Sequence, residues 1–140
     1  MYLLDTNVVS ELRKAGAGRA DPNVARWAAG VPTARLFISV ITLMELESGV
    51  LLMERRDARQ GALLRTWLTA HVVPAFAGRV LPVDEAVARR TAALHVPDPR
   101  PERDALIAAT ALVHGLTAVT RNGADFEPTG VALLNPWLPP

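Results

Sequence analysis

Short apolar runs alternate along the chain with longer segments of helical pattern. The extended runs are Tyr2–Leu4, Leu36–Ser39, Val80–Val83, Thr117–Thr120 and Val131–Leu134. The segments with helical pattern are Val8–Arg13, Asp21 to near Gly30, Thr42 to about Arg55, Asp57 to about Ala70, Asp84 to about His95, and Glu102–His114. Parallel strands need a crossover between them, which is usually a helix. The alternation therefore predicts an α/β fold with a central, mainly parallel sheet flanked by helices.

Local signals support these boundaries. Asp21 followed by Pro22 is typical of a helix start, and Gly115 is typical of a helix end. The proline-dense stretch 96–101 predicts a loop. No internal repeat, low-complexity tract or linker interrupts the pattern, so residues 1–140 are predicted to form a single domain.

Four acidic residues stand where apolar segments begin or end: Asp5, Glu45, Asp104 and Asp125. In a parallel α/β domain, strand carboxyl ends and the following helix starts meet along one edge of the sheet. Carboxylates gathered there would repel, by about 4 kcal/mol for two charges about 4 Å apart at an effective dielectric near 20. A bound divalent cation usually offsets such repulsion. The pattern therefore indicates a metal-dependent enzyme.

Each acid also has a purely structural interpretation. Asp5 can cap the helix that follows it. Thr42 and Glu45 have the spacing of a capping box, which would place Glu45 in the first turn of its helix. Asp104 can be an ordinary first-turn acid, with Ala108 and Ala111 continuing its helical face as small residues. Asp125 lies in a predicted loop, where it can be a turn residue.

Composition excludes several kinds of protein and of functional site. The net charge of +1 provides no global basic field of the kind that coats nucleic acid. The absence of cysteine excludes disulfides, zinc–thiolate sites and thiol nucleophiles. No signal peptide and no membrane-spanning run is visible, so a cytoplasmic location is the expectation. The basic stretch Arg55–Arg65 can be a solvated face or a contact for an RNA backbone.

The sequences around the four acids resemble those of a known family. The opening residues Leu4–Leu12 resemble the start of PIN-domain nucleases, specifically the VapC/FitB-like toxin branch. Further resemblance to this branch is found at Ser39–Leu46 with Gly49, Asp104–Ala111, Thr120–Phe126 and Leu133–Trp137. The motifs occur in the family order and cover essentially the whole chain.

The resemblance implies a PIN-like α/β/α sandwich that acts as a Mg²⁺- or Mn²⁺-dependent endoribonuclease with one or two ions. By the same resemblance, Asp5, Glu45, Asp104 and Asp125 would be the catalytic, metal-binding carboxylates. The supporting polar residues, which would orient the acids or hold water, are Asn7, Ser39, Thr120 and Asn122. Many relatives carry an additional acid where this chain has Asn122, so a second ion would bind more weakly here.

The resemblance also implies the toxin of a type II toxin–antitoxin pair, with a cognate antitoxin as partner and a homodimer as assembly. Apolar residues on the helices can form the dimer surface or be buried within the monomer: Val8, Val9, Leu12, Leu43, Leu46, Val50 and Leu51.

Two other functions are compatible with parts of the sequence. A non-catalytic binding module could keep the same fold. An aspartyl phosphotransferase of the haloacid dehalogenase type would need a second Asp two residues after Asp5, where Asn7 stands, and a downstream lysine, whereas Lys14 is the only lysine.

Overall fold

The protein, described over all 140 residues by a computed structural model, is built around one sheet of five parallel strands. The strands are β1 (Tyr2–Leu4), β2 (Leu36–Ser39), β3 (Val80–Leu81), β4 (Thr117–Val119) and β5 (Leu133–Leu134). Their order is β3-β2-β1-β4-β5, and Leu3 of the central strand pairs with Phe37 and Ala118. Strand β1 is therefore central: β2 and β3 are added on one side of it, and β4 and β5 are added on the other. The direction in which strands are added thus reverses between β1 and β4.

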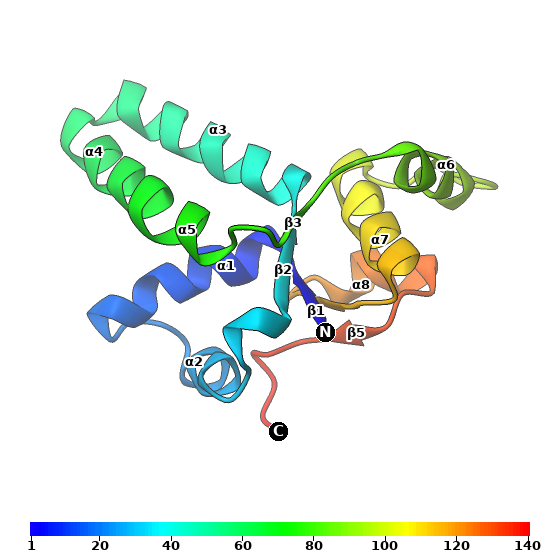
Figure 1. The fold of residues 1–140 in the computed structure, drawn as a ribbon, viewed down its shortest axis with the longest axis horizontal. Coiled ribbons are helices and arrows are strands. Elements are labelled where there is room, and N and C mark those ends of the chain that lie inside the picture. The colour runs from blue at the N-terminus through cyan, green and yellow to red at the C-terminus, as the bar shows by residue number, and fades with distance from the viewer.

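Helices cover both faces of the sheet, which gives the α/β/α arrangement (Figure 1). The helices are α1 (Thr6–Arg13), α2 (Pro22–Ala29), α3 (Val40–Arg56), α4 (Ala58–Trp67), α5 (Val73–Ala75), α6 (Glu85–Leu94), α7 (Glu102–His114) and α8 (Gly123–Phe126). Helices α1 to α5 lie on one side of the sheet, and α6, α7 and α8 lie on the other. The predicted fold class is confirmed. No helix combines the length and apolar character that crossing a bilayer requires.

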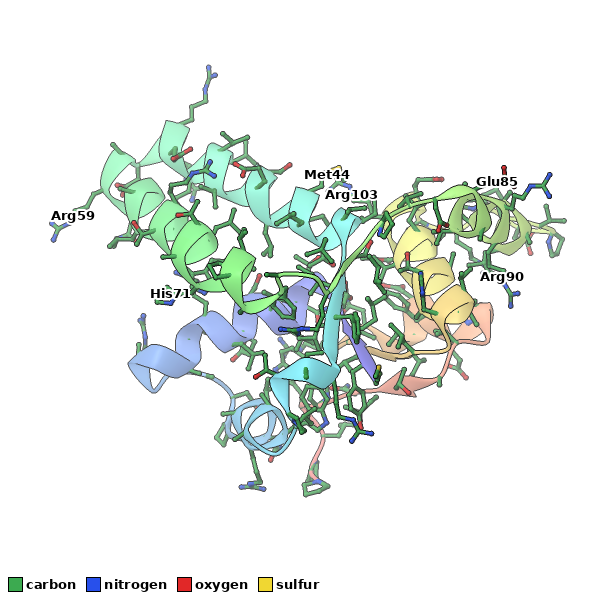
Figure 2. All side chains as sticks on the ribbon, viewed as in Figure 1. Met44, Arg59, His71, Glu85, Arg90 and Arg103 are labelled. Atoms are coloured by element: carbon green, nitrogen blue, oxygen red, sulfur yellow. The ribbon has the colours of Figure 1, made fainter.

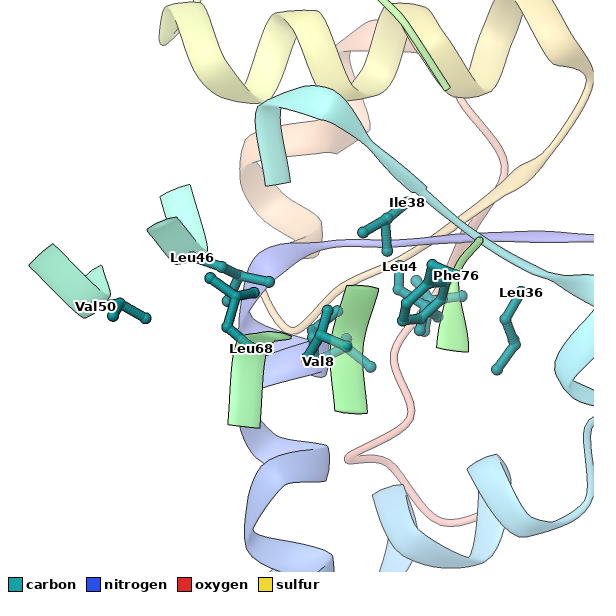
Figure 3. Close-up of a cluster of buried hydrophobic side chains, with 11 residues drawn as sticks. Leu4, Val8, Leu36, Ile38, Leu46, Val50, Leu68 and Phe76 are labelled. Carbon is teal, nitrogen blue, oxygen red and sulfur yellow. The ribbon is translucent and has the colours of Figure 1, made fainter. Parts of the chain in front are cut away.

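Alternating side chains of the strands divide the core in two. Leu4 and Ile38 face α1 and α3, where they pack with Val8 and Leu46 (Figure 3). Leu3, the neighbour of Leu4, faces the opposite layer. On that side the fully buried core includes Ile107, Ala108, Ala111, Ala118 and Phe126. Full burial of one large aliphatic side chain contributes about 1.5–3 kcal/mol, so both layers hold the short strands in place.

Helices α3 and α4 form a tightly packed antiparallel hairpin. Asp57 accepts hydrogen bonds from the backbone N–H groups of Arg59 and Gln60 and so caps α4. Gly61 lies directly against α3, because a Cβ atom at this position would be 2.4 Å from Glu54 Cα. Arg65 adds an ion pair to Glu47, with two N–O distances of 2.9 and 2.5 Å. A π-helical segment, Leu68–Val72, then continues the chain into α5.

Most predicted elements are confirmed, including β1, β2 and α7 with unchanged boundaries. Three short 3₁₀ segments, Lys14–Ala17, Thr33–Arg35 and Glu127–Thr129, and helix α8 were not expected. The apolar helix residues belong largely to the monomer core, since Val8, Val9, Leu46 and Val50 are buried. Leu51 remains 55% exposed.

Candidate functional site

The carboxyl edge of the sheet, at the reversal between β1 and β4, carries the candidate site. Asp5 follows β1 directly, and its backbone N–H donates to the Val119 carbonyl at 2.9 Å, which extends the strand pairing by one residue. Thr120 follows β4 on the adjacent strand. Crevices outside the carboxyl ends of strands at such a reversal are the usual binding position in open α/β sheets.

Asp5 is buried, with 5% of its surface exposed, and is held by three donors. Its Oδ2 accepts from the Thr120 hydroxyl at 2.7 Å and from Asn7 Nδ2 at 3.3 Å. Its Oδ1 accepts from the Thr6 backbone N–H at 2.8 Å, and this contact caps α1. The capping role and the site role of Asp5 are therefore compatible, because one carboxylate serves both.

The loop after β4 is tied to the same network. The backbone N–H of Asn122 donates to Thr120 Oγ1 at 3.0 Å, and the backbone N–H of Arg121 donates to Asn7 Oδ1 at 3.3 Å. Asn7 thus links α1 to this loop while its amide nitrogen faces Asp5, a donor role that a second aspartate could not fill. Asn122 contributes through its backbone, and its side chain makes no hydrogen bond.

Glu45 reaches the site from the second turn of α3, so the capping-box prediction was wrong. The helix begins at Val40, and Ser39 caps it by accepting from the Ile41 N–H at 3.0 Å. Thr42 is consequently inside the helix and fully buried. Glu45 Oε1 instead accepts from the Thr6 hydroxyl at 2.6 Å, which connects α3 to α1. Ser39 supports the site only by positioning this helix, since it bonds to none of the four acids.

Asp104 and Asp125 approach from the other layer and differ from Asp5 in having no partner. Asp104 lies in the first turn of α7 and is half-buried, and Asp125 is exposed. Neither carboxylate makes a side-chain hydrogen bond or an ion pair. Asp125 lies within helix α8, whereas the sequence predicted a loop. The small residues Ala108 and Ala111 are fully buried, as their place on the face of Asp104 suggested.

Asp5 and Asp104 each lie in the electrostatic field of other acids of this set. Burial raises the pKa of Asp5, and the charges of Glu45 and Asp125 raise it further, against the lowering effect of its bonds to Thr120 and Thr6. Burial also raises the pKa of Asp104, followed by the charges of Asp5, Asp125 and Glu45. No three of these side chains come close enough to form a ready-made coordination group. The acids thus lie around one region, but in this structure they do not form a complete set of metal ligands.

Three contributing residues were missed by the sequence reasoning. Thr6 holds both Asp5 and Glu45, and the Thr42 hydroxyl lies 3.3 Å from that of Thr6. Arg103 places its Nη1 3.5 Å from Glu45 Oε2. Thr6 adjoins Asp5 in the sequence, and Arg103 adjoins Asp104. This adjacency to predicted site residues was the feature of the sequence that could have identified them.

Comparison with known proteins agrees with this fold. Residues 2–130 match the family model of the PIN domain. The chain is 38% identical to the VapC ribonuclease Y4jK of Sinorhizobium fredii over 144 residues, with 99% of each chain covered. It is 38% identical to the toxin FitB of Neisseria gonorrhoeae over 145 residues, covering 98% of this chain and 99% of FitB. The crystal structure of FitAcB from N. gonorrhoeae superposes with a TM-score of 0.88 at 35% identity, covering 98% of this chain and 99% of that one.

The family model spans nearly the whole chain, and the relatives align from end to end. The chain therefore belongs to the PIN-domain family, in the branch that contains VapC and FitB.

Proposed function

We propose that this protein is a metal-dependent endoribonuclease that hydrolyses RNA phosphodiester bonds with Mg²⁺ or Mn²⁺, one or two ions being bound. The observation that carries the proposal is the arrangement at the carboxyl edge of the sheet, where Thr6 joins Asp5 to Glu45 and where the charges of Asp104 and Asp125 act on the same region. The names of relatives such as the VapC ribonuclease Y4jK support RNA as the substrate.

The donor set suits a hard divalent cation. All four side chains offer carboxylate oxygens, which Mg²⁺ and Mn²⁺ prefer, and no histidine or cysteine is among them. Burial raises the pKa of Asp104, and the charges of Asp5, Asp125 and Glu45 raise it further, so a bound cation would relieve this repulsion. Asp5 and Asp104 would be the main ligands, with Glu45 and Asp125 completing the set. When bound, such an ion supplies a Lewis acid and a water of lowered pKa.

The residues around the acids orient them for this task. Thr120 and Thr6 fix both oxygens of Asp5, and Thr6 also fixes Glu45. These contacts fix the orientation of Asp5 and Glu45 on the α1 and α3 side of the site. Asp125 lacks such support. Asn122, directly before the same helix α8, is neutral, so the local negative charge is lower than it would be with an acid at position 122. A second ion on this side would therefore bind more weakly than the first.

Two aspartate substitutions test the proposal. The variants Asp5→Asn and Asp104→Asn are expected to lower Mn²⁺-dependent RNA cleavage by more than about a hundredfold, because loss of outer partners alone typically costs about 10–100-fold. Glu85→Gln is the matched control, since the Glu85 side chain is 89% exposed on α6 and its ion pair is with Arg89, not with a residue of the site (Figure 2). Full cleavage by folded Asp5→Asn and Asp104→Asn proteins would refute the assignment.

We further propose that the enzyme is the toxin of a type II toxin–antitoxin pair and forms a homodimer. The relatives include the toxin FitB, and solved structures of similar fold include a toxin–antitoxin complex from Klebsiella pneumoniae. Exposed apolar side chains on α3, Met44 at 44%, Leu51 at 55% and Leu52 at 69%, support a protein-binding surface. A monomer in solution would contradict the dimer, and failure of any neighbouring gene product to block cleavage would contradict the antitoxin.

A further inference from the structure

Arg103 is the one basic residue that forms an ion pair with any of the four acids. It stands in the first turn of α7, directly before Asp104. Its Nη1 lies 3.5 Å from Glu45 Oε2, so its side chain extends from α7 toward α3 across the site. Figure 2 shows it near Met44, where the start of α3 faces the start of α7.

This ion pair is not needed to hold Glu45. The Thr6 hydroxyl already fixes the other Glu45 oxygen at 2.6 Å. The Arg103 contact is single and long, and 59% of the Arg103 side chain is exposed, so its contribution to stability is small. Arg65, in contrast, contacts Glu47 through two nitrogen atoms at 2.9 and 2.5 Å. Arg103 is therefore free to exchange Glu45 for another anion.

An RNA substrate of the proposed ribonuclease would need such a cation at this position. Four carboxylates around the site repel phosphate groups, and the net charge of +1 provides little attraction elsewhere. A guanidinium binds phosphate through two parallel N–H donors, which a lone carboxylate contact at 3.5 Å does not use. At the first turn of α7, one residue from Asp104, the Arg103 side chain borders the region where the reacting phosphate would lie.

We propose that Arg103 binds an RNA phosphate at the mouth of the site, leaving Glu45 when the substrate enters. The inference rests on the proposed ribonuclease function, and it adds that Arg103 contacts a phosphate group of the RNA backbone. It is a substrate-binding role, distinct from that of the carboxylates.

The test compares Arg103→Ala with Arg90→Ala. Arg90 is an exposed arginine on α6, outside the basic stretch Arg55–Arg65, and its side chain makes no hydrogen bond or ion pair, so it controls for the loss of one positive charge (Figure 2). Binding of a fluorescently labelled, mixed-sequence single-stranded RNA is measured with Ca²⁺ in place of Mg²⁺ at several salt concentrations. Arg103→Ala is expected to weaken binding about tenfold and to reduce the slope of log K against log salt by about 0.7, the value for one lost contact to single-stranded RNA.

Two further measurements separate substrate binding from a structural role. Arg103→Lys keeps the charge but not the paired donors, so its affinity should lie between those of the wild type and Arg103→Ala. Calorimetric titration with Mn²⁺ should show unchanged or tighter binding in Arg103→Ala, because a positive charge next to Glu45 is removed. A loss of Mn²⁺ affinity with unchanged RNA affinity would instead assign Arg103 to positioning Glu45 and overturn the proposal.

Failure of the proposed role of Arg103 can be distinguished from failure of the ribonuclease proposal. If the wild type cleaves RNA but Arg103→Ala binds RNA with the affinity and salt slope of Arg90→Ala, only the role of Arg103 is wrong. If the wild type cleaves no RNA with Mg²⁺ or Mn²⁺, the ribonuclease proposal fails, and the role of Arg103 in binding the substrate fails with it.

Discussion

Replacing Thr120 with valine removes one hydroxyl from the centre of the site with little change in shape. This hydroxyl donates to Asp5 Oδ2 at 2.7 Å and accepts from the Asn122 N–H at 3.0 Å. In the variant, Asp5 Oδ2 keeps only the longer contact to Asn7, at 3.3 Å. A buried carboxylate is then less well solvated by the protein, and its orientation is less restricted.

The size of the effect follows from these contacts. A hydrogen bond to a charged group contributes about 1.5–3 kcal/mol. Loss of a residue that orients a metal ligand typically lowers metal affinity by about 10–100-fold, which corresponds to about 1.4–2.7 kcal/mol. We therefore expect Thr120→Val to weaken Mn²⁺ binding by about 10–100-fold.

The pH dependence gives a second readout with a defined sign. The Thr120 hydroxyl lowers the pKa of Asp5, whereas burial raises it. Without the hydroxyl the pKa of Asp5 rises, so the carboxylate becomes protonated at a higher pH than in the wild type. The acid limb of the cleavage rate should therefore move to higher pH in Thr120→Val.

The assay is calorimetric titration with Mn²⁺, together with cleavage rates measured across the acid range. Thr91→Val is the matched control, because Thr91 is also buried and its hydroxyl bonds only to the Val87 carbonyl within α6, at 2.8 Å. The control should retain wild-type Mn²⁺ affinity and pH profile. If Thr120→Val behaved like this control in both measurements, the assignment of Thr120 as the residue that orients Asp5 would be wrong.

Two predictions concern stability. The pKa of Asp104 is raised above its ordinary value of 3.8, so the folded state binds this proton more tightly than the unfolded state, and stability falls as pH rises through that pKa. In EDTA, Asp104→Asn should therefore melt at a higher temperature than the wild type at neutral pH, with the difference vanishing at lower pH; a lower melting temperature at neutral pH would contradict this. Gly61→Ala should lower the free energy of unfolding by about 1–3 kcal/mol in urea titrations, because its Cβ would lie 2.4 Å from Glu54 Cα. Gly49→Ala, at an open position in α3, should instead stabilise by about 0.5–1 kcal/mol, and equal effects of the two changes would show that the α3–α4 contact is not tight.

The elements with strong local signals could be predicted closely. Helix α7 has clear start and end residues, and Gly115 after it adopts a positive φ of 66°, a conformation that favours glycine. Helix α8 contains only four residues, which is too short to show a helical period. Strand pairs are non-local, so the short strands β3 and β5 could be located only approximately from the sequence.

The start of α3 illustrates why a correct site residue was given a wrong local structure. Thr42 and Glu45 have the spacing of a capping box, but Ser39 ends β2 and caps the helix itself. The apolar residues Val40 and Ile41, which continue the strand pattern in the sequence, are already helical. Glu45 is therefore one turn further along, where the hydroxyl of Thr6 can reach it.

The sequence by itself determined the α/β class, the main helices and the presence of acids near the ends of strands and the starts of helices, because these depend on short-range patterns of apolar, capping and turn residues. Only the tertiary structure decided which groups meet. The parallel order around β1 brings Thr120 to Asp5 and Thr6 to Glu45, and it sets Arg103 against the same site. Such contacts join residues that are distant in the chain, and their distances depend on how the helices pack against the sheet.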